Sequence, residues 1–313
     1  MIVKSATQKS NVKIVVADDE AFMREIVVNA LSSGGFREIR SVAKLGLLQE
    51  VVEAIYPDLV ILNAEIADGD AVDFVRRMRL YSVGRNPFVP VILTAWHSER
   101  AFVRRVIDCG ADVLVTKPFA AGQLFARIDF LATARPSFVV TSNYIGPDRR
   151  KSPRDDAFPR FDVPNTLKER IGGREFDPED LNSRISKMFP AMMRQRQHCQ
   201  EKEIGSQYAA ISKAARERRP VEEISSVIAA IVESAARYAG EMARARGGGN
   251  ADQADALVKM LRTIAATNKG FSEEDCATTE KMLDALGIMV PAAIVPETGS
   301  DDMGVSVEPA SGG

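Results

Sequence analysis

Histidine, cysteine and tryptophan are scarce in this chain of 313 residues, and each shortage excludes a class of site. The chain has 2 histidines, 3 cysteines and 1 tryptophan. Two histidines are too few for a multi-histidine metalloenzyme. Cys109, Cys199 and Cys276 lie far apart, without metal-ligand or redox spacing, and their odd number argues against a disulfide framework. A reducing compartment therefore suits the chain best.

Long apolar runs and an excess of one charge are also absent. No apolar run approaches the roughly 18 residues needed to cross a bilayer, and the first residues contain no apolar signal core. We therefore expect a cytoplasmic protein without membrane contact. The net charge of −2 names no class of partner. The sequence offers no phosphate loop, nucleophile motif or metal cluster, so it does not indicate an enzyme.

Residues 11–135 alternate short β-branched runs with amphipathic segments of helical period. The predicted strands are 12–17, 38–43, 59–62, 88–94 and 112–116, and the helices lie near 20–33, 44–55, 70–80, 98–108 and 120–133. Five strands separated by helices indicate βαβ units and a parallel sheet covered on both faces. The expected fold is α/β, a five-stranded, doubly wound and flavodoxin-like domain.

The rest of the chain has a different composition. Residues 136–176 are rich in proline, arginine and aspartate and have no clear period, which predicts a linker. Residues 177–290 have helical patterning throughout and are predicted to form an all-α domain. Residues 291–313 are small and acidic and include proline, which predicts a disordered tail.

One segment of the predicted linker has a distinctive sequence, "YIGPDRR" at 144–150. Its composition gives it no mechanism of its own. One hypothesis is that it docks back on the first domain. Tyr144 would then be the anchor, with Arg149 and Arg150 on acidic groups.

The predicted helical domain contains recognisable helix N-termini and stripes of apolar residues at helical spacing. Asp177 is predicted as an N-cap with Pro178 at the first helical position, and Pro190 is predicted to end or kink that helix. Apolar stripes at 221–242 and 254–264 are joined by a short glycine turn, which suggests an antiparallel hairpin. The width of the first stripe favours a bundle core over a two-stranded coiled coil. Dimerisation through this region stays open.

Polar residues stand where the strands of the first domain end. Asp18 and Asp19 follow the first strand, and Asn63 follows the third. Thr94 ends the fourth strand, and Lys117 follows the fifth. Ligands of open parallel sheets bind at the carboxyl ends of the strands. Carboxylate oxygens suit Mg²⁺, while a hydroxyl and an ammonium group suit a phosphoryl group.

In order and spacing, "VVADDEAFMR", "PDLVILN", "DGDA", "PVILTA" and "VTKPF" resemble the receiver domain of bacterial two-component response regulators. The resemblance covers about residues 11–135. It implies that a histidine kinase phosphorylates an aspartate after the third strand. It also implies that Asp18 and Asp19 hold Mg²⁺. Thr94 and Lys117 match the residues that sense the phosphoryl oxygens.

The position of the phosphoacceptor carries Asn63 instead of aspartate. A carboxylate is an anionic nucleophile that forms an acyl phosphate, whereas an amide is neutral and hardly nucleophilic. Losing one negative charge also predicts that Mg²⁺ binds weakly, if it binds at all. Two other residues depart from the family pattern. Ala67 replaces a usual proline, and Leu114 replaces the usual tyrosine or phenylalanine that moves with the threonine.

Three interpretations of Asn63 stay open at this point. It is a natural residue of a pseudo-receiver, or it is an engineered replacement of a normal acceptor. In the third, Asp68 or Asp70 nearby takes over as the acceptor. Their place on the loop after the strand argues against the third interpretation, because they should point away from Lys117.

Three other residues are assigned ordinary roles. Trp96 is predicted to pack on the following helix, and His97 to be a solvated loop residue. His198 is a solvated helix residue rather than a phosphotransfer histidine, because the lysine-glycine pair typical after such a histidine is absent.

The sequence therefore predicts a two-component response regulator with a substituted acceptor. It would act through protein–protein contacts of its helical domain, and its partner would be a histidine kinase or another signalling protein. The alternative is a DNA-binding regulator with an unrecognised helical output domain. Basic clusters at 194–197, 213–219 and 244–247 are interleaved with acidic residues, and no helix-turn-helix pattern is evident. Nucleic acid binding is therefore disfavoured but stays open.

Overall fold

The computed structural model describes residues 9–97, 99–150, 158–244, 251–267 and 271–291. The chain divides into two compact units, Met1–Gln200 and Glu201–Gly313. The division falls inside one helix, α8 (Pro178–Arg216). The predicted glycine turn at 247–250 and the predicted tail beyond residue 291 lie outside the described residues.

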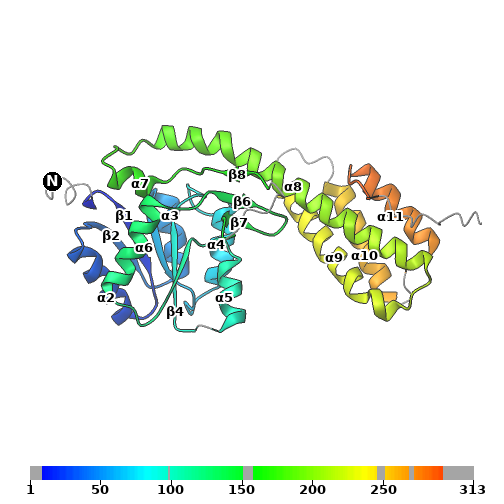
Figure 1. Cartoon of the computed structure of the whole chain (residues 1–313), viewed down its shortest axis with the longest axis horizontal. Helices are drawn as coiled ribbons and strands as arrows, with labels where there is room; N and C mark the ends of the chain where they lie inside the picture. The colour runs from blue at the N-terminus through cyan, green and yellow to red at the C-terminus, as the bar shows by residue number, and fades with distance from the viewer. Residues whose placement is uncertain (1–8, 98, 151–157, 245–250, 268–270, 292–313) are drawn as a thin grey trace, which may run out of the picture. The chain divides into compact units, whose positions relative to one another are not determined.

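The first unit is built on a five-stranded sheet in the order β2-β1-β3-β4-β5 (Figure 1). Its strands are β1 (Lys13–Ala17), β2 (Glu38–Val42), β3 (Leu59–Asn63), β4 (Val91–Ala95) and β5 (Val113–Thr116). All four neighbouring pairs are parallel. The predicted fold class is confirmed. Among the five strands, β4 departs most from its predicted bounds. It begins after Pro90, a residue without an N–H to donate to the ladder of hydrogen bonds.

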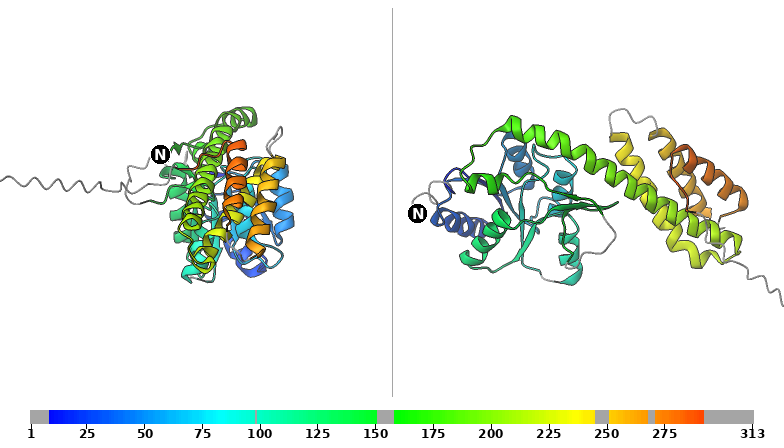
Figure 2. Two further views of the ribbon diagram at one scale, coloured as in Figure 1. Left: turned by 90° about the vertical axis from the view of Figure 1, so that its right-hand side faces the viewer. Right: turned by 45° about the horizontal axis from the view of Figure 1, so that its top comes forward.

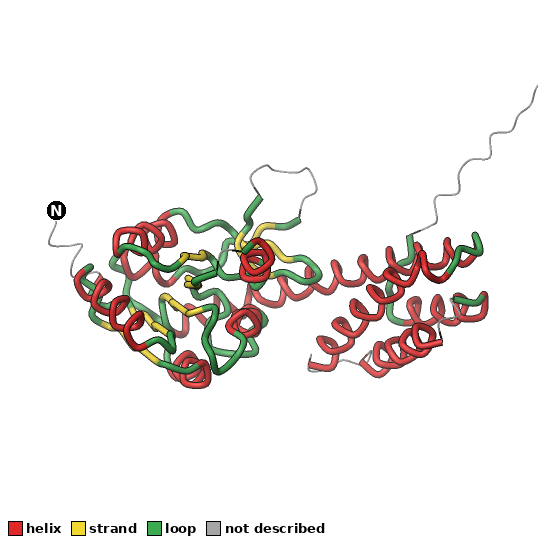
Figure 3. Tube along the Cα trace, turned by 90° about the horizontal axis from the view of Figure 1, so that it is seen from below, coloured by secondary structure: helices red, strands yellow, loops and turns green. Residues whose placement is uncertain are grey.

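Helices cover both faces of this sheet, and the strands lie between them (Figure 3). They are α2 (Ala21–Ser33), α3 (Leu45–Ala54), α4 (Ala71–Arg79), α5 (Arg100–Ile107) and α6 (Ala121–Thr133). Successive residues of β1 point to opposite faces. Ile14 and Val16 belong to a core that includes residues of α2 and α6. Val15 and Ala17 belong to a core that includes residues of α3, α4 and α5.

Residues 136–176 differ from the predicted linker, because their described part is folded. They contain β6 (Phe138–Val140), β7 (Ile145–Pro147), β8 (Arg160–Phe161) and helix α7 (Thr166–Ile171). The three strands form a second sheet in the order β7-β6-β8. Strands of two or three residues are too short to show a periodic signal. Their stability comes from contacts with the first domain, which no local pattern predicts.

Two glycines bring the β6–β7 hairpin against the main domain. Gly110 has φ +88°, and a Cβ there would lie 2.1 Å from the carbonyl oxygen of Ile145. A Cβ at Gly146 would lie 2.8 Å from the Cα of Gly110. No side chain fits between these two segments of backbone, so glycine is required for this approach.

The "YIGPDRR" segment does lie against the first domain, but with different contacts from those predicted. The Tyr144 hydroxyl donates to the Pro147 carbonyl at 2.9 Å, within the segment itself. The Arg149 guanidinium donates to the Ala111 carbonyl, not to an acidic group. Arg150 forms a local ion pair at 2.9 Å with Asp148, another residue of the segment.

A buried charge cluster ties α4, β5 and the end of α6 together. Asp112 accepts from Arg79 at 3.0 Å and from Arg135 at 2.7 Å. The remaining guanidinium N–H groups donate to backbone carbonyls, at 2.9 Å to Gly110 and at 2.7 Å to Phe88. Burial lowers the pKa of Arg79 to about 10 despite the attraction of Asp112. The cluster has no local signal in the sequence, since its members lie far apart in the chain.

Helix α8 runs through Pro190, so of the two predicted alternatives, a helix end or a kink, the helix end does not occur. Its predicted start is confirmed, since the Asp177 carboxylate accepts from the Glu179 N–H at 2.9 Å. Leu181 and Met192, on either side of the proline, are buried in one core with residues of the hairpin. A proline inside a helix costs about 3 kcal/mol. Burial of this apolar face offsets that cost.

In the second unit the described residues contain helices and no strands (Figure 3). Beyond the end of α8 the helices are α9 (Val221–Arg244), α10 (Ala251–Thr267) and α11 (Glu273–Ala285). Helices α9 and α10 lie side by side (Figures 1 and 2). Ile228, Ile231, Leu257 and Leu261 of the two predicted stripes are buried in a common core. Among the described helices, none is long and apolar enough to span a membrane.

Candidate functional site

The polar residues singled out in the sequence lie at one edge of the sheet. Asn63 is the last residue of β3 and pairs in register with Thr94 of β4. Asp18 follows β1, and Lys117 follows β5. Asp18, Asn63, Thr94 and Lys117 are all buried, whereas Asp19 is exposed. Parallel strands bring their carboxyl ends to the same edge, which explains the convergence.

Asp18 and Lys117 form a buried ion pair. The Lys117 ammonium lies 2.8 Å from Oδ2 of Asp18, and the two side chains are 1% and 4% exposed. Oδ1 of Asp18 accepts from the Glu20 N–H at 3.1 Å. Arg24 donates to the backbone carbonyl of Asp18 at 2.7 Å. Lys117, 99 residues away in sequence, is thus held by one member of the acidic pair.

Asn63 interacts with the other member of the pair. Its Nδ2 donates to Oδ1 of Asp19 at 2.9 Å, and the Ala67 N–H donates to Oδ2 at 3.2 Å. Desolvation raises the pKa of Asp19, but the hydrogen bonds from Asn63 and from backbone N–H groups outweigh it and lower that pKa. The amide therefore acts as a neutral donor that stabilises a neighbouring carboxylate. An amide in this place supplies no nucleophile.

The two aspartates on the loop that follows Asn63 are both used as caps. Asp68 accepts from the Leu45 N–H at the start of α3, with both oxygens at 2.9 Å. Asp70 is the N-cap of α4 and accepts from the Val72 N–H at 2.8 Å. These contacts hold the carboxylates on helix termini. Their positions support the expectation that neither replaces the missing acceptor.

A second group of residues at this edge was not recognised from the sequence. The Trp96 N–H donates to Glu65 at 2.6 Å, and its indole N–H donates to Glu20 at 2.8 Å. The Lys117 ammonium lies 5.6 Å from the centroid of the indole ring. His97 contacts the same carboxylate of Glu65 through Nδ1. The hydrogen bonds and the ring contact of Trp96 are with Glu65, Glu20 and Lys117, not with the following helix as predicted. His97 lies on a loop with its side chain 64% exposed, as predicted, although it also contacts Glu65.

A signal for this group did exist in the sequence. Glu65 stands two residues after Asn63, and Trp96 stands two residues after Thr94. In parallel neighbouring strands, residues at equal offsets beyond a register pair lie close together. The contact therefore follows from the residues just beyond the strand ends, not from the strand ends themselves.

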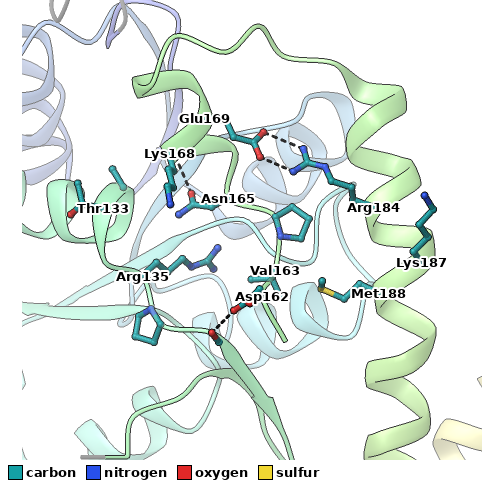
Figure 4. A pocket seen from close by; sticks show the side chains of 14 residues that line it. Thr133, Arg135, Asp162, Val163, Asn165, Lys168, Glu169, Arg184, Lys187 and Met188 are labelled. Carbon is teal, nitrogen blue, oxygen red and sulfur yellow. Dashed lines mark hydrogen bonds and ion pairs between the residues drawn. The ribbon is translucent and has the colours of Figure 1, made fainter. Parts of the chain in front are cut away.

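A cavity of about 710 Å³ lies elsewhere in the first unit, between the end of α6, residues 162–169 and α8 (Figure 4). Its arginines are already neutralised. Arg184 forms an ion pair with Glu169 at 2.6 Å, and Arg135 pairs with Asp112. Asp162 accepts from the Ser137 hydroxyl at 2.5 Å. The arginines and the acidic residues named here therefore bind each other and hold this part of the fold together.

Comparison with known proteins identifies the domain that holds the strand-end site. The family model described as the response regulator receiver domain matches residues 14–129. Residues 14–129 are a response regulator receiver domain.

The curated relatives that match part of this chain include two proteins named transcriptional regulatory proteins. KDP operon transcriptional regulatory protein KdpE of Escherichia coli (strain K12) is 34% identical over 116 residues, which are 37% of this chain and 48% of KdpE. Phosphate regulon transcriptional regulatory protein PhoB of the same organism is 30% identical over 116 residues, 37% of this chain and 49% of PhoB. The chain thus spans about half the length of the curated relatives it matches.

Solved structures similar to this chain include a chemotaxis receiver. Vibrio cholerae chemotaxis protein CheY4 is 19% identical, with a TM-score of 0.35, and the similarity covers 38% of this chain and 96% of that one. The family model ends at residue 129. The helical second unit lies outside that match.

Receiver domains typically bind Mg²⁺ at the acidic pair, and the same pair is present in this domain. Asp18 and Asp19 supply hard carboxylate oxygens. Both already accept hydrogen bonds, from Lys117 and from Asn63. Among the described residues, no three histidine, cysteine or acidic side chains are grouped as metal ligands. The set fits a weak site for Mg²⁺ rather than a strong one.

Proposed function

We propose that this chain is a two-component response regulator whose receiver domain does not accept a phosphoryl group at residue 63. Its helical second unit would carry the output through contacts with another protein. Asp18 and Asp19 would hold Mg²⁺ weakly, and Thr94 and Lys117 would line the site. A histidine kinase or another signalling protein is the partner we propose for the receiver domain.

The observation that carries this proposal is the amide of Asn63 at the end of β3. Its nitrogen donates to Asp19 at 2.9 Å, so the residue is fixed by the site itself. Phosphoryl transfer requires a nucleophile in line with the donor, and positioning with charge neutralisation supplies most of the catalysis. Here the neutralising groups are in place, and the nucleophile is missing. We therefore propose a receiver domain that retains the residues around the phosphorylation site but does not undergo phosphoryl transfer at residue 63.

Helical output through protein contacts is supported by the second unit. Its described helices share one core of a kind found in helical bundles. The relatives KdpE and PhoB are named transcriptional regulators, which makes DNA binding the alternative. Against it, the basic cluster near the end of α8 is partly neutralised, since Glu217 pairs with Lys213 and with Arg219. A salt-dependent gel shift with random DNA separates the two, because phosphate contacts weaken steeply as salt rises.

Intact mass spectrometry after incubation with acetyl phosphate or phosphoramidate and Mg²⁺ tests the central claim. The unmodified chain should gain no phosphoryl group. The Asn63→Asp variant should gain one, because the ion pair and the hydroxyl around it remain. Asn63→Ala is the matched control, since it also removes the Asp19 contact but adds no carboxylate.

Two outcomes would contradict the proposal. The first is a phosphoryl group on the unmodified chain that Asp68→Asn or Asp70→Asn abolishes, which would identify a neighbouring acceptor. The second is an Asn63→Asp variant that stays unlabelled while its circular dichroism matches that of the unmodified chain. That result would show that the surrounding groups no longer form a phosphoryl site.

A further inference from the structure

The Glu65 side chain connects the loop after β3 to the loop after β4. Its Oε2 accepts from the Trp96 N–H at 2.6 Å, and its Oε1 contacts Nδ1 of His97. The first contact is to backbone, so it fixes the position of the loop rather than that of a flexible side chain. Hydrogen bonds to a charged acceptor are roughly twice as strong as neutral ones.

Two more groups hold the same loop. The Trp96 indole donates to Glu20 at 2.8 Å, and the Lys117 ammonium lies 5.6 Å from the ring centroid. The loop after β4 is therefore held from three elements, the loops that follow β1, β3 and β5. Surface ion pairs usually contribute little. This arrangement differs because a backbone donor and an indole are fixed at the same residue.

The Glu65 carboxylate is ionised at neutral pH. Desolvation raises its pKa, but hydrogen bonds from His97 and from the Trp96 N–H outweigh it, so the pKa falls below the ordinary 4.5. Its side chain is 21% exposed. Glu65 thus presents a permanent negative charge two residues beyond the place where a phosphoryl group would stand on an acceptor.

We propose that Glu65 is a built-in anion that holds Trp96 and His97, the two residues after β4, in one position without phosphorylation. This inference rests on the proposed function, in which residue 63 carries no phosphoryl group. A phosphoryl group after β3 would offer oxygens to the end of β4. Asn63 offers none, whereas Glu65 extends a carboxylate from the same loop to the residue two positions beyond Thr94. The regulatory state of the loop is then fixed by the sequence and not by a kinase.

Trp96 gives a direct readout, because it is the only tryptophan of the chain and is 45% exposed. The test compares the unmodified full chain with Glu65→Gln and Glu65→Ala. Amide exchange at Trp96 and acrylamide quenching of its fluorescence are measured. Both variants should speed exchange of the Trp96 N–H by about tenfold, the loss expected for one charge-assisted hydrogen bond. Quenching should rise in parallel.

Glu53→Gln is the matched control, an exposed carboxylate on α3 that accepts from Gln49. It should leave both signals unchanged. Circular dichroism checks that the Glu65 variants remain folded. Exchange and quenching equal to those of the unmodified chain in both variants would overturn the proposal. Loosening in Glu65→Ala but not in Glu65→Gln would also overturn it, because a neutral acceptor would then suffice.

The measurement does not depend on phosphorylation, so its failure is distinct from that of the proposed function. A chain that accepts a phosphoryl group but loosens on loss of Glu65 would contradict the proposed function alone. A chain that stays unlabelled but does not loosen would contradict the proposed role of Glu65 alone.

Discussion

Replacing Asp112 with asparagine should destabilise the first unit strongly. The Asp112 carboxylate is the counter-charge of two guanidinium groups, of Arg79 at 3.0 Å and of Arg135 at 2.7 Å. It also accepts from the Val91 N–H at 2.8 Å, at the start of β4. Asparagine keeps one oxygen acceptor but leaves both cations without a neutralising charge.

The expected loss of stability follows from the burial of all three charged side chains. The side chains of Arg79, Asp112 and Arg135 are 1%, 1% and 4% exposed, so solvent screens their charges very little. Breaking a buried pair by removing one partner costs about 3–5 kcal/mol. With a urea dependence of about 2 kcal/mol per molar, the unfolding midpoint should fall by roughly 1.5–2.5 M.

Urea unfolding followed by Trp96 fluorescence measures the shift of the midpoint, since the single tryptophan of the chain lies in the first unit. The control is Asp73→Asn, which removes an exposed pair with Arg77 whose side chains are 40% and 59% exposed. That change should cost less than about 0.5 kcal/mol. If Asp112→Asn lowers the midpoint no more than Asp73→Asn does, the cluster does not stabilise the unit and the reasoning is refuted.

Three further predictions concern the hairpin, the metal and the loop. Gly110→Ala should lower the free energy of unfolding by about 2 kcal/mol or more, because the φ of Gly110 is +88° and a Cβ would lie 2.1 Å from a β7 carbonyl oxygen. The control is Gly46→Ala in α3, where a Cβ meets open space, so this change should be neutral or stabilising. Thermal melting of the two variants compares them. Calorimetric titration should show that Asn63→Asp binds Mg²⁺ at least about tenfold more tightly than the unmodified chain, since it adds a carboxylate, and equal affinities would contradict this. The hydrogen bond with Glu65 raises the pKa of His97 above 6.5. The ion pair between protonated His97 and Glu65 should therefore be fully formed at pH below 6.5, and it should be lost as the pH rises through the raised pKa of His97. Trp96 fluorescence should follow that titration, and Glu65→Gln should return its midpoint towards 6.5.

The strand-end site was predictable because its geometry is local to each strand. A buried β-branched run followed by a polar residue marks the carboxyl end of a strand, and a parallel sheet then brings those ends together. Asp18, Asn63, Thr94 and Lys117 followed from that rule alone. The structure adds how they pair, which strand order does not determine. The ion pair of Asp18 with Lys117 is an example.

What the sequence could not predict are contacts between distant residues that have no period. Arg79, Asp112 and Arg135 read as ordinary surface charges in their own segments, and only the tertiary fold buries them together. The hairpin was interpreted as a linker for the same reason, because its short strands are stabilised by Gly110 and its neighbours. Pro190 shows the opposite case: proline is a local signal for a helix end or a kink, and the helix continues through it where the flanking apolar residues are buried.

A single amide accounts for two features of the receiver site together. In a site with an acceptor aspartate, the carboxylates after β1 and β3 would stand close together and repel each other, and a cation would be needed between them. Here the Asn63 nitrogen donates to Asp19 at 2.9 Å, so a neutral hydrogen-bond donor stands where the third carboxylate would be, and that repulsion is absent. The Lys117 ammonium neutralises Asp18 at 2.8 Å. Because this chain's own side chains compensate the acidic pair, the site attracts Mg²⁺ less than a site with three carboxylates would.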